Sequence, residues 1–375
     1  MKKGMQLDEL ARKIMENSQK KVDYTVNTNA MEMKLPEAYC TVDGDIVEGK
    51  NLVGKAPSSM QKPRLSLMGV DGRFDVTAVA HQQLSAHLEI PRKFYDEQLN
   101  KNPDLFSVMV NTLMARNPKP RFVRTLDGNA RAILSNSYRP IDYEDIAPML
   151  LEGLLGSGAE IRSCDITERK LYIKALFPKT EIEVFKGDVI QMGMAFSNSE
   201  IGLGQISFEP LVYRLVCENG MIMQDTSVKR RHLGARMSMD EDGLAMEFVK
   251  DDTRKALDQA LILQIRDTMT MLAQPESAQR YIMRFQDAAQ QQLKDPVAAV
   301  QVLQKKASLA DDDRLGILNH LVRGGDLSRW GLANAVTRHS QDVTSYDRAT
   351  ELEYLGGTII DLSQSDWKSI GEAAA

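Results

Sequence analysis

Cationic side chains are concentrated in one stretch of the sequence, between residues 114 and 140. This stretch contains six lysine or arginine residues and a single acid, Asp127, which gives it a local charge of +5. Cations bind phosphate groups by charge, and an arginine can also form two parallel hydrogen bonds with one phosphate. The stretch therefore predicts a surface that binds a polyanion. Its cations are Arg116, Lys119, Arg121, Arg124, Arg131 and Arg139.

A second group of cations lies within and shortly after an apolar, β-branched run at residues 208–220. The run ends in Asn219-Gly220, a pair that tolerates positive φ and is typical of a turn. We therefore expect a strand that ends in this turn and brings the cations to one edge of a sheet. The cations are Arg214 within the run and, shortly after it, Lys229, Arg230, Arg231 and His232.

Aromatic rings are interleaved with both groups of cations. Phe122, Tyr138 and Tyr213 could stack on exposed bases, which contributes roughly 1 to 3 kcal/mol per base. Taken alone, Tyr138 and Tyr213 are each better explained as ordinary aromatic residues at the edge of the core. Together with the cations, however, the rings favour single-stranded DNA as the ligand. The expected DNA-binding residues are Arg116, Lys119, Arg121, Arg124, Arg131, Tyr138, Arg139, Arg214, Lys229, Arg230 and Arg231.

The charge of the whole chain is −5, whereas a domain that binds nucleic acid usually has a basic balance. Acids are gathered elsewhere, at residues 240–242, 251–252 and 311–313. These acidic runs could confine a polyanion to one track by repelling it from other faces. They could equally be ordinary solvated faces of the protein.

Motifs for catalysis and cofactor binding are weak in this sequence. Glu168 and Lys170 have the Glu-x-Lys spacing by which some nucleases place a metal-binding carboxylate beside a lysine, but such a tripeptide is common. No Walker loop or dinucleotide fingerprint is present. The histidines include no pair at the i, i+4 spacing that places two imidazoles on one helical face for zinc. We therefore expect no cofactor and no metal, and an enzyme is the less favoured hypothesis. The histidines are His81, His87, His232, His320 and His339.

The length and composition are those of an ordinary globular protein. The 375 residues suggest two domains, or one domain with extensions. Three widely spaced cysteines argue against both a local metal motif and a disulfide framework. Polar residues interrupt the N-terminal segment, and no run of about 18 apolar residues occurs, so neither export nor membrane insertion is expected. We expect a cytoplasmic protein.

Hydrophobic periodicity predicts the elements that must position these residues. An amphipathic helix is expected over residues 6–19, and the helical pattern of residues 77–99 is interrupted at Ile90-Pro91. The fold class is expected to be α+β, with an antiparallel β-meander packed with helices and a helical C-terminal part. Further elements are a strand- and turn-rich region over 22–80, a helix over 143–155, strands at 160–166, 169–177, 188–197 and 204–217, and mainly helix from 253 to about 336. The expected segments are 1–75, strand- and turn-rich; 76–250, an α+β core with a basic surface; and 251–375, mainly helical.

Four stretches of the sequence resemble the successive motifs of a known family. They are residues 121–128 (RFVRTLDG), 131–141 (RAILSNSYRPI), 214–220 (RLVCENG) and 330–337 (WGLANAVT). These motifs are similar to those of the phage/plasmid-like proteins classed as domain of unknown function 932, and the resemblance covers roughly residues 75–355. It implies a phage, prophage or plasmid setting, in which DNA recombination or host takeover is natural, but it supplies no mechanism. A helix followed by a meander is also similar, at the level of fold alone, to Rad52-type single-strand annealing proteins.

These observations favour a protein of a phage or other mobile element that binds single-stranded DNA and promotes annealing or recombination. A cationic groove would hold the DNA backbone and leave the base edges free to pair. The protein could also form a homo-oligomer. Two alternatives stay open: a metal-dependent nuclease, which needs carboxylates gathered near Glu168, and a regulatory or anti-defence protein that binds a host protein with the same surface.

Overall fold

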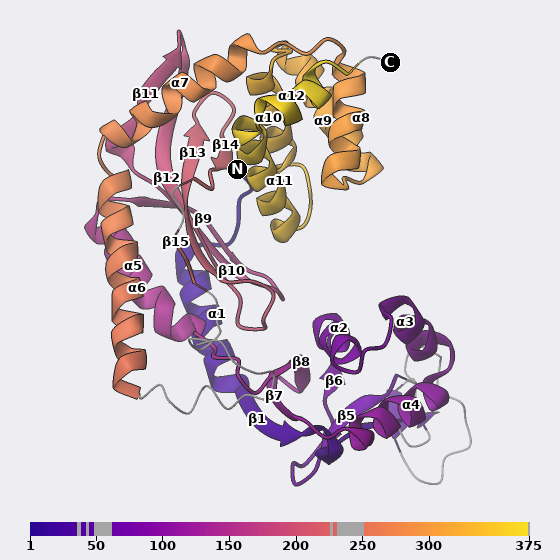
Figure 1. Ribbon diagram of the computed structural model, residues 1–375. Helices are drawn as coiled ribbons and strands as arrows, with labels where there is room; N and C mark the ends of the chain where they lie inside the picture. Colours follow the sequence, from indigo (N-terminus) through magenta and orange to yellow (C-terminus); the bar gives the residue numbers. More distant parts are fainter. Residues whose placement is uncertain (36–38, 43–44, 49–61, 226–227, 231–250, 374–375) are drawn as a thin grey trace. The chain divides into compact units, whose positions relative to one another are not determined.

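The computed structural model describes residues 1–35, 39–42, 45–48, 62–225, 228–230 and 251–373 (Figure 1). The described residues form two compact units. Unit 1 contains Met1–Ile14 and the described parts of residues 141–232 and 249–375, and unit 2 contains the described parts of residues 15–140. These units cut across the three segments expected from the sequence, because strand β1 (Lys21–Asn27) pairs with strand β7 (Pro120–Leu126), about a hundred residues further along the chain.

Helix α1 (Leu7–Lys20) is the expected amphipathic helix near the N-terminus. Its buried residues are Leu10 and Ile14, two members of the apolar stripe that predicted it. Both belong to the main hydrophobic core of unit 1. The helix therefore forms because one narrow face can be buried while its charged residues stay in solvent.

Unit 2 is built on a four-stranded sheet in the order β1-β7-β8-β6. Strand β8 (Asn129–Ser135) forms an antiparallel hairpin with β7, and the short strand β6 (Asp75–Val76) joins β8 in parallel. The hairpin turns at Asp127-Gly128, where both residues have positive φ, of 49° and 76°. Two smaller antiparallel pairs complete its strands: β2 (Met31–Lys34) with β5 (Arg64–Leu67), and β3 (Tyr39–Val42) with β4 (Asp45–Glu48).

Three helices supply the rest of the unit 2 core. Helices α2 (Ala78–His87) and α3 (Arg92–Lys101) confirm the helical pattern interrupted at Ile90-Pro91, and α4 (Pro103–Arg116) follows them. The Thr77 hydroxyl caps α2 by accepting a hydrogen bond from the backbone N–H of Ala80. Tyr95 and Phe106 meet edge to face, with their ring centroids 4.9 Å apart, in a core that also contains residues of β2, β5, β7 and β8.

Unit 1 is built on a seven-stranded antiparallel sheet, which confirms the expected meander and the α+β class. The strand order is β14-β13-β12-β10-β9, with β11 paired to β12 and β15 paired to β13. The four expected strands are β9 (Glu160–Ile166), β10 (Leu171–Leu176), β12 (Asp188–Asn198) and β13 (Ile206–Arg214). The short strands β11 (Ile182–Phe185), β14 (Asn219–Ile222) and β15 (Val228–Arg230) add to them.

Helices pack around this sheet. The helices of the C-terminal part extend to residue 371, beyond the expected limit of about residue 336. Helix α5 (Tyr143–Gly156) precedes the sheet, and α6 (Asp251–Leu272) and α7 (Glu276–Gln290) contact β12. Figure 1 shows the last five helices gathered beside β14. They are α8 (Pro296–Ala307), α9 (Asp311–Gly324), α10 (Arg329–His339), α11 (Tyr346–Asp361) and α12 (Gln364–Gly371).

The two faces of the unit 1 sheet differ in polarity. Because side chains alternate along a strand, Met192, Met194 and Phe196 of β12 enter the apolar core that α5, α6 and α7 share. The opposite face carries buried polar groups, among them Lys174 and Glu209, which contact side chains of α11. Helix α11 approaches β14 closely, since a Cβ atom at Gly357 would lie 2.0 Å from the carbonyl oxygen of Ile222.

Candidate functional site

The six cations of the basic stretch lie on or beside the β7–β8 hairpin of unit 2. Arg121 and Arg124 belong to β7, where they stand opposite Ser135 and Ala132 of β8. The register shifts between Arg124 and Thr125, so that Arg131 is an extra residue in β8 and stands opposite no residue of β7. Such a bulge changes the direction in which the side chain of the extra residue points. The hairpin was not foreseen from the sequence, although Asp127-Gly128 between two β-rich runs is a strong hairpin signal.

Four of the six cations gather at the open end of this hairpin, away from its turn. Arg116 is the last residue of α4, and Lys119 directly precedes β7. The Lys119 backbone is fixed by Thr28, whose hydroxyl accepts from the Lys119 N–H and whose N–H donates to the Lys119 carbonyl. Arg121 is the second residue of β7, and Arg139 follows the end of β8. Arg116, Lys119 and Arg139 are exposed.

Arg121 differs from its three neighbours because it is half-buried. Burial lowers the pKa of its guanidinium, and its buried Nε forms no hydrogen bond with a described residue. The imidazole of His87 lies near it: burial lowers the pKa of His87, and the charges of Arg121 and Lys119 lower it further. His87 is therefore neutral and donates its Nε2–H to the carbonyl of Ile133, at 2.8 Å.

Arg124 and Tyr138 are placed quite differently from the exposed cations. The Arg124 side chain is fully buried and makes a two-pronged ion pair with Asp23 of β1, with both N–O distances 3.0 Å. Its guanidinium also lies over the ring of Phe122, 5.8 Å from the centroid. Tyr138 is 8% exposed. Both residues are therefore buried, and Arg124 joins the hairpin to β1.

The second group of expected cations lies in unit 1, and two of them are engaged with carboxylates. Arg214 at the end of β13 makes a two-pronged ion pair with Asp188 of β12, at 2.6 and 2.8 Å, and lies over the Trp330 ring. Lys229 of β15 pairs with the buried Glu209, at 2.7 Å. Arg230 belongs to the backbone of β15, but its side chain, like Arg231 and His232 as a whole, lies outside the described residues.

Asn219 and Gly220 do not form the expected turn, and that prediction was wrong. The turn consists of residues 215–218, with Glu218 at a φ of 53°, and Asn219 already begins β14. The Asn219 side chain is buried and donates from Nδ2 to Thr337 Oγ1 at 2.5 Å and to Asn334 Oδ1 at 3.2 Å. Two of the four family-like stretches, 214–220 and 330–337, therefore meet in space. Asn219 makes the contact between β14 and α10.

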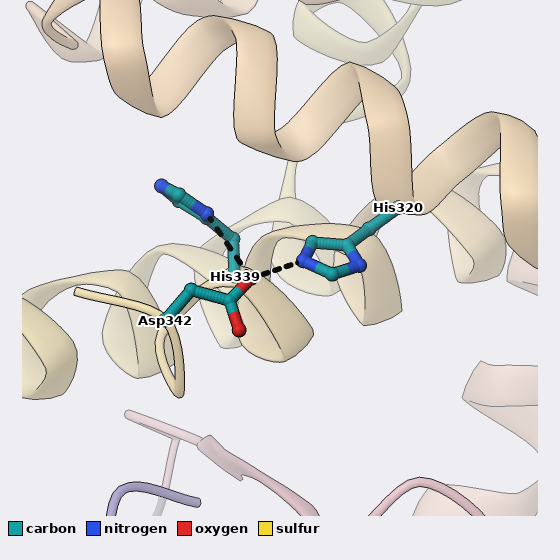
Figure 2. Close-up of side chains that lie close together, drawn as sticks. All are labelled: His320, His339 and Asp342. Carbon is teal, nitrogen blue, oxygen red and sulfur yellow. Dashed lines mark hydrogen bonds and ion pairs between the residues drawn. The ribbon is translucent and has the colours of Figure 1, made fainter.

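A group of three metal-ligand side chains, which the sequence did not predict, lies among the C-terminal helices of unit 1 (Figure 2). His320 of α9, His339 at the end of α10 and Asp342 just beyond it each direct a potential ligand atom at the others, and these atoms all lie within 4.8 Å of one another. The i, i+4 criterion missed the group because the two histidines belong to different helices. The available signal was the i, i+3 spacing of His339 and Asp342.

Glu168 is exposed, in the turn between β9 and β10. Within the described part of the chain, Glu168 belongs to no comparable group of three His, Cys, Asp or Glu side chains. None of the helices in that part is both long and apolar enough to cross a membrane.

Among the comparisons with known proteins, only the comparison with family models finds a match. Neither the curated proteins nor the solved structures contain a significant match. The family model described as "Domain of unknown function (DUF932)" matches residues 131–355, a span from β8 to α11 that includes the His320–His339–Asp342 group. This match confirms the family resemblance over residues 131–355, which include three of the four family-like stretches but not 121–128. The chain therefore belongs to the DUF932 family.

Proposed function

We propose that this protein binds single-stranded DNA through unit 2 and promotes the annealing of complementary strands, in the recombination of a phage or other mobile element. The observation that supports the proposal is the open end of the β7–β8 hairpin. The four cations there, Arg116, Lys119, Arg121 and Arg139, form no ion pair with any described residue. Cations that no protein carboxylate neutralises remain available for phosphates.

The arrangement favours contacts with the DNA backbone over contacts with the bases. Three of the four cations are exposed on a framework fixed by the hairpin and by the Thr28–Lys119 hydrogen bonds. The expected stacking residue Tyr138 is buried, and Phe122 lies against Arg124. Binding through phosphates alone is independent of sequence and leaves the base edges free, as annealing requires.

Arg121 gives the surface a specific feature beyond charge. A buried guanidinium N–H without an acceptor is uncommon and calls for an explanation. Because Arg121 is only half-buried, a phosphate at the hairpin would meet the accessible part of its guanidinium and form a charge-assisted hydrogen bond there. We therefore assign Arg121 to the phosphate track beside the three exposed cations.

The test is a measurement of binding and annealing with the full-length chain at several salt concentrations. Fluorescence anisotropy with a labelled oligothymidine should show tighter binding than with duplex DNA of the same length, and the affinity should fall as salt rises. The triple variant Arg116→Ala, Lys119→Ala, Arg139→Ala should bind more weakly. Its salt slope should fall by about 2 units, on the rule of about 0.7 per phosphate contact for single strands.

A matched control removes the same charge elsewhere. Lys294, Lys305 and Arg323 are exposed in unit 1, and their replacement by alanine changes the net charge equally. This control should keep the parental salt slope and the parental rate of annealing of two complementary labelled strands. Equal losses in both triple variants, or binding that does not respond to salt, would contradict the proposal. Native mass measured with and without the oligonucleotide would test the accompanying expectation of a homo-oligomer.

A further inference from the structure

The group of His320, His339 and Asp342 has the composition and geometry of a metal-binding site. His320 Nε2 lies 2.5 Å from Asp342 Oδ2, and His339 Nδ1 lies 3.9 Å from the same oxygen. Figure 2 shows both imidazole rings directed at this one carboxylate oxygen. Two imidazole nitrogens and one carboxylate oxygen are a common ligand set for divalent transition metals, zinc and iron among them.

Contacts from outside the group orient His339. Its Nε2 donates a hydrogen bond to Asp313 Oδ1 at 3.2 Å, and Asp313 Oδ2 in turn accepts from Arg348 at 2.6 Å. With the proton on Nε2, the other ring nitrogen presents its lone pair toward Asp342 and His320. A histidine whose outer nitrogen donates to a carboxylate is the arrangement typically found behind a metal ligand.

The inward nitrogen of His339 is otherwise unexplained. His339 is 8% exposed, and its buried Nδ1 forms no hydrogen bond with a described residue. The chain also makes room for the ring, since a Cβ atom at Gly316 of α9 would lie 2.3 Å from His339 Nδ1. A purely structural hydrogen-bond network accounts for His320 and Asp342, but it leaves this buried nitrogen without an acceptor or donor.

Asp342 is also held from its outer side. Its Oδ1 accepts from Arg338 Nη1 at 3.2 Å, which leaves Oδ2 facing both histidines. The Asp342 side chain is 46% exposed, so solvent reaches the group from this side. Ligands bound to a metal here would therefore come from the protein on one side and from water on the other.

We propose that His320 Nε2, His339 Nδ1 and Asp342 Oδ2 bind one divalent transition metal ion of the zinc type. Metal–ligand bonds of about 2.0–2.1 Å place the ligand atoms of a tetrahedral site about 3.4 Å apart. The separations of 2.5 and 3.9 Å lie on either side of that value, and the two histidine nitrogens lie within 4.8 Å of each other, so shifts of about 1–1.5 Å suffice. Three protein ligands leave a position for water, which is the composition of catalytic rather than structural zinc sites. This inference does not depend on DNA binding, because its residues belong to unit 1.

The test uses full-length protein purified without a histidine tag and titrated with Zn²⁺ against a chromogenic chelator. One Zn²⁺ should bind per chain. His320→Gln and Asp342→Asn should each weaken binding by at least about 10–100-fold, the loss caused by removing even an outer partner of a metal ligand. Asp313→Asn, which keeps all three ligands and only loosens His339, should weaken binding within that same range. Co²⁺ should give visible absorption bands that His320→Gln abolishes.

Matched controls keep the test decisive. His87→Gln removes a histidine of unit 2, and Asp311→Asn removes an exposed acid of α9, so both should bind Zn²⁺ as the parent does. The side chains of His320 and Asp342 are partly exposed to solvent, so their replacement should not unfold the protein. Circular dichroism should show that both variants remain folded. Absence of stoichiometric binding, or equal affinity in the parent and in both ligand variants, would overturn the proposal.

Discussion

Lys174 of β10 and Glu353 of α11 form an ion pair at 2.5 Å in which both side chains are buried. Lys174 also donates to Thr350 Oγ1 at 3.0 Å, and its ammonium lies 4.6 Å from the centre of the Tyr346 ring. Burial is the largest single effect and by itself would lower the pKa of Lys174, but the charges and hydrogen bonds of Glu353 and Tyr346 together outweigh it, and the pKa is raised. The polar face of the unit 1 sheet is therefore attached to α11 by a charged contact.

Breaking this ion pair on one side should destabilise unit 1 strongly. Lys174→Met or Glu353→Leu leaves one group buried without its partner, and each should lower the free energy of unfolding by about 3–5 kcal/mol. The double variant Lys174→Met, Glu353→Leu removes both charges and should cost much less than the sum of the two single changes. The two tryptophans of the chain, Trp330 and Trp367, both lie in unit 1, so tryptophan fluorescence during urea unfolding reports on this unit. Additive losses would show that the two charges do not interact.

Asn219 should contribute to stability through its contacts with α10. Asn219→Ala leaves the buried side chains of Asn334 and Thr337 without their donor, which should cost about 1–3 kcal/mol. Asn319→Ala, a change of the same kind at an exposed position of α9, should lie within about 0.5 kcal/mol of the parent. Both are measured by tryptophan fluorescence in urea. A neutral Asn219→Ala would show that its hydrogen bonds to α10 contribute nothing to stability.

The elements that the sequence predicted well are those whose signals are local. The stripe containing Leu10 and Ile14 identified α1, Pro91 marked the start of α3, and alternation identified the strands of the meander. Asn219-Gly220 failed because a turn four residues long ended just before it, at Glu218. A pair of turn residues indicates that a turn is near but does not fix its register.

The candidate sites were harder to predict because they depend on strand register and on helix packing. Counting charges cannot reveal that Arg214 meets Asp188, since the two residues become neighbours only when β12 and β13 pair. The same holds for Arg124 and Asp23, which are cross-strand partners on β7 and β1. His320 and His339 are brought together by α9 and α10, and no spacing rule for a single helix detects that.

Unit 2 should lose stability in mild acid through His81. Burial lowers the pKa of His81 from 6.5 to about 4, and the neutral ring forms a hydrogen bond with the Tyr95 hydroxyl, 2.9 Å from Nδ1. Because the folded pKa is depressed, this stabilisation is complete above pH 6.5 and is lost as the pH falls toward 4. The expected loss between pH 7 and pH 4 is on the order of 3 kcal/mol.

Hydrogen exchange of α2 and α4 amides measures this effect in unit 2 directly. His81→Gln keeps an acceptor for Tyr95 but cannot titrate, so its stability should change much less over the same pH range. His87, whose pKa is also lowered, acts in the same direction, and His87→Gln is the matched variant. An unchanged pH dependence in His81→Gln would assign the acid sensitivity to other groups.

Arg214 should be needed for stability and not for DNA binding. Its guanidinium is already used by Asp188 and lies over Trp330, so a phosphate would have to compete with a two-pronged ion pair. Arg214→Ala leaves the largely buried Asp188 without its partner and should destabilise unit 1 by about 1.5–3 kcal/mol, the range for hydrogen bonds to charged groups. Arg214→Lys keeps the charge but not the forked geometry, and most of this loss should remain. The salt slope for oligothymidine binding should be that of the parent in both variants. A folded Arg214→Ala protein with a reduced salt slope would place Arg214 on the DNA track after all.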